Sequence, residues 1–415
     1  MTCKVDKEVH VRSENGKPIS VVAITRRSAN PSEWIEVISQ GPLGAERLWR
    51  ISNDSGRTWE SFEPAGMPPA RKPIEGTRVI SHWQSGLFRD EEHNVLISGW
   101  LKATMDESMM GHLDSGGLST RKMYYQISRD GGKNWGELCP IIEGEYDRNN
   151  WPDGVGCYGG NVDINQGITL TDNSILFVTF KFRHFPETGS IESPEGGWWL
   201  AAGTVKCKWI DSGLNCEFGQ WLTIDRDKSS RGLCEPTVVE LSDGRVLMIM
   251  RGEKPVKTDF PGVKFYSVSH DSGMTWSEPK ILTYEDGSPM YSSSAMVQVF
   301  RWNACDGIYL ITNILERDDI IRECDPRYPI QIAKLNEETL CVEKDSITVI
   351  EDRQSEQAAN IRFSNFVHME DRQTGALRIY MTACPGNVGK KSGDNVPLDS
   401  YEYTINGGKT EPDDE

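Results

Sequence analysis

The sequence predicts an all-β fold, a six-bladed β-propeller of four-stranded antiparallel blades whose ring is closed by the N-terminal strand. Three observations lead to this prediction. One turn motif recurs along the chain, and pairs of short apolar strands recur between its copies. No segment has sustained helical periodicity.

The recurring turn has the form S-x-D-x-G-x-T/N-W and occurs at residues 52–59, 128–135 and 269–276, each time after a strand-like stretch. In such a turn the Asp carboxylate accepts hydrogen bonds from nearby backbone N–H groups. The Gly allows a positive φ, and the Trp anchors the turn to its own sheet. Each copy is therefore expected to connect two strands of one blade.

The spacing of the turns predicts the number of blades. The serines that open the first two copies are 76 residues apart, and those of the second and third copies are 141 apart, about twice 70. A unit with a degenerate turn is therefore expected in between, over residues 201–224. A chain of 415 residues holds close to six units of this length.

A second repeat consists of two apolar strands joined by a polar turn. The clearest copy is 236–250, with an Asp-Gly turn in its middle, and further copies lie at 167–179, 295–311 and 366–381. Closure of the ring would pair strand 8–12 with strand 400–405 and remove exposed sheet edges. We expect one propeller over residues 1–406 and a flexible tail over 407–415.

Composition excludes several classes of function. The 62 acidic residues exceed the 45 basic ones by 17, which argues against a nucleic-acid or anionic-membrane partner. No apolar run is long enough to span a bilayer, and the first residues contain no apolar signal core. The ten cysteines lack metal-ligand spacing and are typical of reduced, buried thiols. These features predict a cytoplasmic protein with no cofactor or metal, although a chain that had lost its leader would look the same.

The three turns resemble the Asp-boxes (BNR repeats) of the sialidase, or neuraminidase, superfamily, and the whole chain resembles a six-bladed sialidase-like propeller. In that superfamily the turns lie away from the active site, so they indicate the fold more than the activity. Residues 234–251 resemble the fourth-blade hairpin, in which a Glu opens the first strand and an Arg ends the second. The resemblance implies that Glu235 assists a nucleophile. It also implies that Arg251, together with Arg327 before the third strand of the fifth blade, binds the substrate carboxylate.

The sequence departs from the superfamily at two places. Retaining sialidases attack with a Tyr at the start of the last blade, where this chain has Phe363. The Arg-Ile-Pro signature near the N-terminus is also missing. Tyr291, one blade earlier, is the available phenol and could act as nucleophile or general acid. These departures argue against authentic sialidase activity and leave a carboxylate–arginine pocket suited to an acidic sugar.

Each candidate also has a purely structural interpretation. Glu235 and Arg251 could form an ion pair across their hairpin, Arg327 could contact Asp325, and Tyr291 could pack between blades.

Five further candidates lie at the ends of inner strands or in a long loop. The loop, residues 102–122, could supply a general acid, for which Asp106 and Asp114 are equivalent alternatives. The substrate-binding candidates are His82, Asn161 and Asp163. The structural alternatives are a solvated loop charge for Asp106 and a tight turn for Asn161 and Asp163.

These residues predict an exo-acting glycoside hydrolase for a terminal acidic sugar, which is sialic acid or a related ulosonic or uronic acid. The alternatives are a polysaccharide lyase with Tyr291 or His82 as its base and a glycan-binding propeller without catalytic activity.

Overall fold

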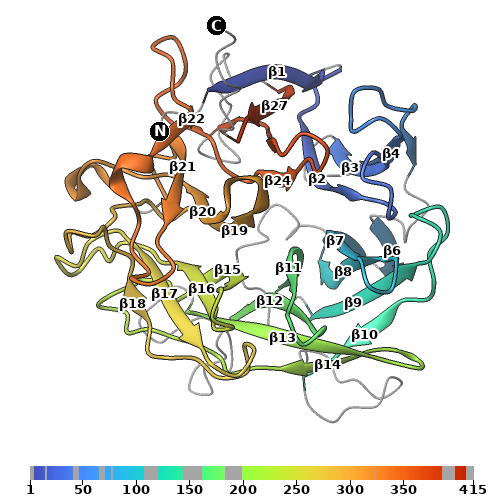
Figure 1. Cartoon of the computed structure of the whole chain (residues 1–415), viewed down its shortest axis with the longest axis horizontal. Helices are drawn as coiled ribbons and strands as arrows, with labels where there is room; N and C mark the ends of the chain where they lie inside the picture. The colour runs from blue at the N-terminus through green and yellow to red at the C-terminus, as the bar shows by residue number, and fades with distance from the viewer. Residues whose placement is uncertain are drawn as a thin grey trace, which may run out of the picture.

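A computed structural model describes residues 4–14, 16–40, 46–64, 71–75, 78–106, 120–143, 161–182, 199–322, 324–385 and 398–407. Six antiparallel sheets follow one another around a central axis (Figure 1). This arrangement confirms the predicted six-bladed β-propeller. The described residues contain no helix with the length and apolar character that a membrane crossing requires.

The first three blades occupy the N-terminal half of the chain. Blade one contains β2 (Ile19–Arg26), β3 (Trp34–Gln40), β4 (Glu46–Ser52) and β5 (Glu63–Pro64). Blade two contains β6 (Arg71–Glu75), β7 (Arg78–Asp90), β8 (Val95–Asp106), β9 (Thr120–Ser128) and β10 (Cys139–Ile141). Blade three contains β11 (Asn161–Thr169), β12 (Ile175–Phe182), β13 (Leu200–Ile210) and β14 (Gly213–Phe218).

The remaining blades complete the ring. Blade four contains β15 (Cys234–Glu240), β16 (Val246–Arg251), β17 (Lys264–Ser269) and β18 (Lys280–Ile281). Blade five contains β19 (Gln298–Trp302), β20 (Gly307–Thr312), β21 (Ile330–Leu335) and β22 (Thr348–Glu351). Blade six contains β24 (Val367–Glu370), β25 (Leu377–Met381), β27 (Ser400–Ile405) and β1 (Val5–Val11). A separate two-stranded sheet pairs β23 (Ile361–Arg362) with β26 (Cys384–Pro385).

Blade two differs from the prediction in two ways. It has five strands, because β7 and β8 are 13 and 12 residues long and β6 pairs with the extension of β7. The predicted loop 102–122 is also shorter than expected. Lys102 and Lys122 pair across β8 and β9, and β8 continues to Asp106. The extra strand pairing therefore converts both ends of the expected loop into sheet.

The N-terminal strand closes the ring as predicted. β1 pairs antiparallel with β27, with Val5 opposite Ile405 and Val9 opposite Tyr401. One blade thus combines the first and the last strand of the chain, and β1 and β27 lie side by side in Figure 1. The predicted C-terminal tail lies, from residue 408 onward, outside the described residues.

The three recurring turns share one hydrogen-bond pattern. In the third copy, Ser269 Oγ accepts from Gly273 N at 2.9 Å, and Asp271 accepts from Thr275 N at 2.8 Å and from Thr275 Oγ1 at 2.6 Å. Gly273 has φ +85°, and a Cβ there would lie 2.6 Å from Leu176. Glycine is therefore required both by the turn and by the contact with blade three.

Apolar clusters fill the spaces between adjacent blades. Leu247 and Ile249 of blade four pack with Ile308 and Leu310 of blade five, and equivalent clusters occupy the other five junctions. The inner strands lie around the axis, so residues of β2, β11, β15 and β24 line one axial cavity. This packing brings side chains from distant parts of the chain to the same place.

Candidate functional site

Glu235 occupies a strained position at the axial end of blade four. It is the second residue of β15, where the register with β16 shifts between Cys234 and Thr237. Its φ is +43°, a conformation that is uncommon for residues other than glycine and is further disfavoured before a proline such as Pro236. Strained residues of this kind cluster at functional sites. The side chain lines an axial cavity of about 470 Å³.

Glu235 is paired with Arg251, the last residue of β16. Their Oε1 and Nη1 atoms are 2.6 Å apart, and the two side chains are 38% and 7% exposed. Burial alone would raise the pKa of the Glu235 carboxyl, but the charge and hydrogen bond of Arg251 outweigh it and the pKa is lowered. Glu235 is therefore ionised at neutral pH.

Arg327 lies beside this pair but contacts neutral groups. Its Nε donates to Cys324 O at 3.1 Å, its Nη1 to Ser364 Oγ at 3.2 Å and its Nη2 to Ser294 O at 3.0 Å. The residue is 8% exposed. Burial and repulsion from Arg251 lower its pKa. Among the described residues, Arg327 has no carboxylate partner at ion-pair distance, which makes its surroundings suited to an anion.

The segment around Ser294 joins the cations. Ser294 Oγ accepts from Arg251 Nε at 2.9 Å, while its carbonyl accepts from Arg327. The fully buried Lys264 donates from Nζ to the carbonyls of Ser293 at 2.8 Å and Ala295 at 2.7 Å. Burial, followed by the two neighbouring guanidinium groups, holds the pKa of Lys264 well below its usual range. Glu235, Arg251 and Arg327 therefore converge within one small region.

Asp163 of β11 lines the same axial cavity as Glu235. Its carboxylate accepts from Asn165 N at 3.0 Å. Burial raises the pKa of Asp163 to about 7, and the negative charge of Glu235 adds to the effect. The two carboxyl groups thus differ in protonation near neutral pH, with Asp163 partly protonated and Glu235 ionised.

Tyr291 and Phe363 occupy positions with other contacts. The Tyr291 carbonyl accepts from Leu315 N at 2.9 Å, and its half-buried side chain packs against the cluster between blades three and four. Tyr291 is not among the described residues that line the Glu235 cavity. Phe363 is 3% exposed in the core between blades five and six, and its N donates to Arg327 O at 3.0 Å. The residue at the expected tyrosine position therefore supports Arg327 through its backbone.

For three predicted residues the structure describes the backbone only. His82 lies in β7 opposite Lys102, and Asp106 ends β8 opposite Arg78. Asn161 begins β11 opposite Phe180. The structure does not describe the side chains of these three residues, and Asp114 lies outside the described residues. The roles of all four therefore stay predictions.

No sequence motif singles out several residues that complete the site. Asn365 also lines the axial cavity and has φ +58°, while Ser294 and Ser364 accept hydrogen bonds from Arg251 and Arg327. Lys264 fixes the backbone on both sides of Ser294. The sequence predicts a role for the phenol of Tyr291 in the stretch 291–294. In the structure the serine hydroxyl and carbonyl groups of this stretch act as acceptors for the cations.

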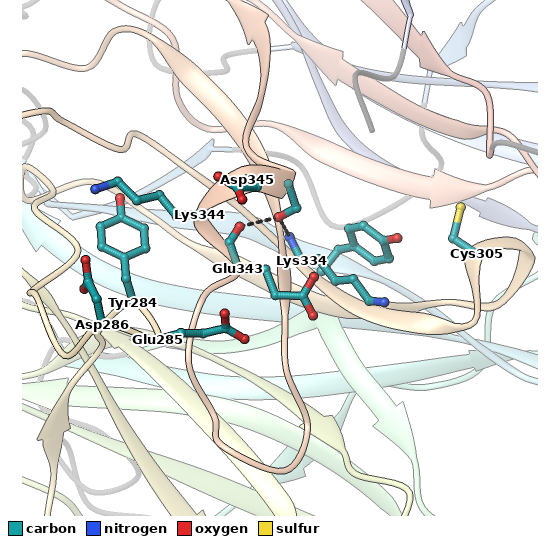
Figure 2. A pocket seen from close by; sticks show the side chains of 10 residues that line it. Tyr284, Glu285, Asp286, Cys305, Lys334, Glu343, Lys344 and Asp345 are labelled. Carbon is teal, nitrogen blue, oxygen red and sulfur yellow. Dashed lines mark hydrogen bonds between the residues drawn. The ribbon is translucent and has the colours of Figure 1, made fainter.

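A second cavity of about 690 Å³ lies in blades four and five (Figure 2). It contains Lys334 and Lys344 together with four carboxylates, and it shares no described lining residue with the Glu235 cavity. Ser346 Oγ accepts from Lys334 N at 2.7 Å and donates to Glu343 O at 2.6 Å, which fixes the turn that forms one wall. These contacts are structural. Among the described residues, no three His, Cys, Asp or Glu side chains are grouped so that they could hold a metal ion.

No family model and no curated protein matches this chain. Solved structures do match it, and their likeness at low identity shows the fold. A protein of unknown function from Dyadobacter fermentans is 13% identical, with a TM-score of 0.61 over 97% of this chain and 99% of that one. The NanB sialidase from Streptococcus pneumoniae is 12% identical, with a TM-score of 0.59 over 96% and 69%. The α-L-arabinofuranosidase Arb93A from Fusarium graminearum is 12% identical, with a TM-score of 0.52 over 96% of each chain.

Proposed function

We propose that this protein is an exo-acting glycoside hydrolase that releases a terminal acidic sugar, which is sialic acid or a related ulosonic or uronic acid. The observation that carries the proposal is the buried pair of guanidinium groups, Arg251 and Arg327, beside the ionised Glu235. The names of two structural neighbours, a sialidase and an arabinofuranosidase, support glycosidase chemistry on this fold.

The two arginines explain why the substrate would be an acidic sugar. A guanidinium group has five N–H donors, and three of those of Arg327 have neutral acceptors among the described residues. A substrate carboxylate would accept from the remaining donors in charge-assisted hydrogen bonds, which are stronger than neutral ones. It would also balance the repulsion between Arg251 and Arg327. The net charge of −17 does not oppose this binding, because cations next to the bound group outweigh distant, screened charges.

The two axial carboxyl groups account for bond cleavage. Glycoside hydrolysis requires a proton donor for the leaving oxygen and a second carboxyl group beside an oxocarbenium-like transition state. Environments that move the pKa values of two neighbouring carboxyls apart assign these roles. Asp163, with a pKa of about 7, is the donor. Glu235, held ionised by Arg251, stabilises the positive charge on the ring and positions the nucleophile.

A panel of methylumbelliferyl and nitrophenyl glycosides tests the proposal. We expect release from at least one acidic sugar, loss of release in Glu235→Gln, and little release from neutral sugars including α-L-arabinofuranoside. Turnover of a neutral sugar alone would contradict the assignment. An unsaturated product that absorbs near the ultraviolet edge would instead identify a lyase.

The burial of Phe363 favours one second candidate, a glycan-binding propeller without turnover. The position where sialidases carry a nucleophilic Tyr is packed into an apolar core and has no hydroxyl. In that case wild-type protein and Glu235→Gln would bind an acidic glycan with the same affinity, and neither would cleave it.

A further inference from the structure

The thiols of Cys207 and Cys216 meet on the outer hairpin of blade three. Cys207 belongs to β13 and Cys216 to β14, and the two residues are direct partners in the antiparallel register. Their Sγ atoms are 2.7 Å apart. Both are free thiols, Cys207 fully buried and Cys216 half-buried.

The geometry of this pair suits a covalent link. Directly opposite residues in an antiparallel sheet have Cβ atoms about 4.5–5.5 Å apart. A disulfide needs about 3.5–4.5 Å between Cβ atoms and 4.4–6.8 Å between Cα atoms. A small local adjustment of the hairpin is therefore enough to join the two sulfurs.

The hairpin is also held firmly against blade two, which keeps the thiols together. Leu214 N donates to Tyr125 Oη at 2.9 Å, and Trp209 Nε1 donates to Asp90 Oδ2 at 2.5 Å. Cys207 packs in the apolar cluster between blades two and three, with Cys216 against its edge. Because the surrounding contacts order both strands, little conformational entropy remains to be lost when the sulfurs bond.

We propose that Cys207 and Cys216 form a reversible cross-strand disulfide when the protein meets a disulfide oxidant such as oxidised glutathione. The Cys216 thiolate attacks one sulfur of the oxidant and releases one glutathione thiolate. The Cys207 thiolate then attacks the Cys216 sulfur of the mixed disulfide and releases the second glutathione. The two cysteines are oxidised by two electrons, one oxidant disulfide is reduced to two glutathiones, and the two cysteine protons end on those thiols.

The exposure of the two thiols determines the order of the steps. Cys216 is the more accessible thiol, so an oxidant in solution reaches it first. Burial raises the pKa of Cys207, which disfavours its thiolate as the first nucleophile. The resulting bond closes a short loop and stabilises the hairpin by restricting the unfolded chain.

Mass spectrometry of the full chain tests the proposal. Incubation with oxidised glutathione, followed by alkylation and digestion, is expected to yield a cross-linked peptide pair containing residues 207 and 216, about 2 Da lighter than its reduced form. Dithiothreitol should reverse the change. Cys207→Ser and Cys216→Ser should each abolish it, whereas Cys341→Ser, which changes a half-buried cysteine of blade five, should not.

A melting experiment adds a second readout. The oxidised wild type should melt a few degrees above the reduced protein, and either serine variant should show no such difference. Full alkylation of both cysteines after oxidation, or a glutathione adduct that persists on Cys216 in the wild type, would overturn the proposal.

Discussion

At the scale of single residues, the site depends on two carboxyl groups in one cavity that keep different charges. Burial raises the pKa of Asp163 to about 7, while Arg251 overcomes burial and lowers that of Glu235. The two pKa values differ because the Arg251 guanidinium lies 2.6 Å from the Glu235 carboxylate and does not form such a pair with Asp163. Residues of the same chemical type thereby become suited to different steps.

This difference predicts the pH dependence of activity. A proton donor must be protonated, so kcat/KM should fall as the pH rises through about 7, the pKa of Asp163. Asp163→Asn should lower kcat by about 10²- to 10⁴-fold and remove the alkaline limb of the profile. The measurement is a pH–rate profile on the best acidic substrate. An Asp163→Asn variant with an unchanged alkaline limb would show that another group donates the proton.

Arg327 predicts a change in specificity. Removal of a charge-assisted contact to the substrate carboxylate costs about 1.5–3 kcal/mol, so Arg327→Gln should raise KM for the acidic sugar about 10- to 100-fold. Arg301→Gln is the matched control, because Arg301 pairs with Glu337 on the rim of blades four and five. If both variants kept the wild-type KM, the substrate carboxylate would not be bound by Arg327.

Glu235 and Arg251 could be predicted from the sequence because they stand at recognisable positions of a hairpin motif. Asn365 and Ser294 could not. Their importance comes from a positive φ and from hydrogen bonds to distant cations, and neither leaves a local pattern. The role of Tyr291 stays a prediction, and the structure adds that it lies outside the described wall of the cavity.

At the scale of elements, the recurring turns hold the outer strands. Burial is the largest single influence on the Asp271 carboxyl and would raise its pKa, but the hydrogen bonds from Thr275, Ser269 and Met274 together outweigh it, and the pKa is lowered. Its stabilising contribution is therefore present above the unfolded pKa near 3.8 and is lost as the pH falls through the folded value.

Asp271→Ala should lower the free energy of unfolding by about 1–2 kcal/mol at pH 7, since the turn loses the acceptor for two backbone N–H groups and two hydroxyls. Asp259→Ala, in a loop of the same blade, is the control. Urea titrations measure both. Equal stability of the two variants would contradict the structural role of the motif.

Ring closure depends on a buried histidine in β1. His10 lies between Glu36, at 2.9 Å, and Glu402, at 3.5 Å. Burial opposes its charge, but the hydrogen bonds to both carboxylates prevail and the pKa of His10 is raised. The protonated His10 therefore stabilises the folded state. This stabilisation is complete below 6.5, the pKa of His10 in the unfolded chain, and is lost as the pH rises through the higher pKa of the folded protein.

The free energy of unfolding should therefore fall as the pH rises above about 6.5. His10→Gln should be less stable at pH 6 and should lack this part of the slope. The exposed His270, changed in His270→Gln, should leave the slope intact. Denaturant titrations at a series of pH values measure the free energy of unfolding of each protein. Parallel curves of this free energy against pH for the wild type and His10→Gln would exclude this role of His10.

The strands themselves were largely predictable, because alternation of apolar residues and turn residues are local properties. The fifth strand of blade two was not. The extension of β7 and β8 is stabilised by their pairing with each other and with β6, and this pairing joins residues whose own sequence is polar or irregular.

At the scale of the whole molecule, the ring places the site. Apolar clusters between successive blades fix the angles between the sheets. The N-terminal strand β1 pairs with β27 and so completes the last blade. Asp163 and Glu235 lie near the starts of the inner strands β11 and β15 and line one cavity. Arg327, in the loop before β21 of blade five, reaches the same region because it shares Ser294 with Arg251. The number of blades could be predicted from the repeat spacing. The distances inside the site could not, since they depend on packing across several blades.

The central claim is that Glu235, Arg251 and Arg327 form one site for the carboxylate of an acidic sugar. Isothermal titration of Glu235→Gln with an acidic glycoside tests it most directly, because this variant should bind without cleavage. One saturable site is predicted, together with affinity about 10-fold or more weaker when Arg327→Gln is added. Equal affinity with and without Arg327, or no binding of any acidic glycoside, would contradict it.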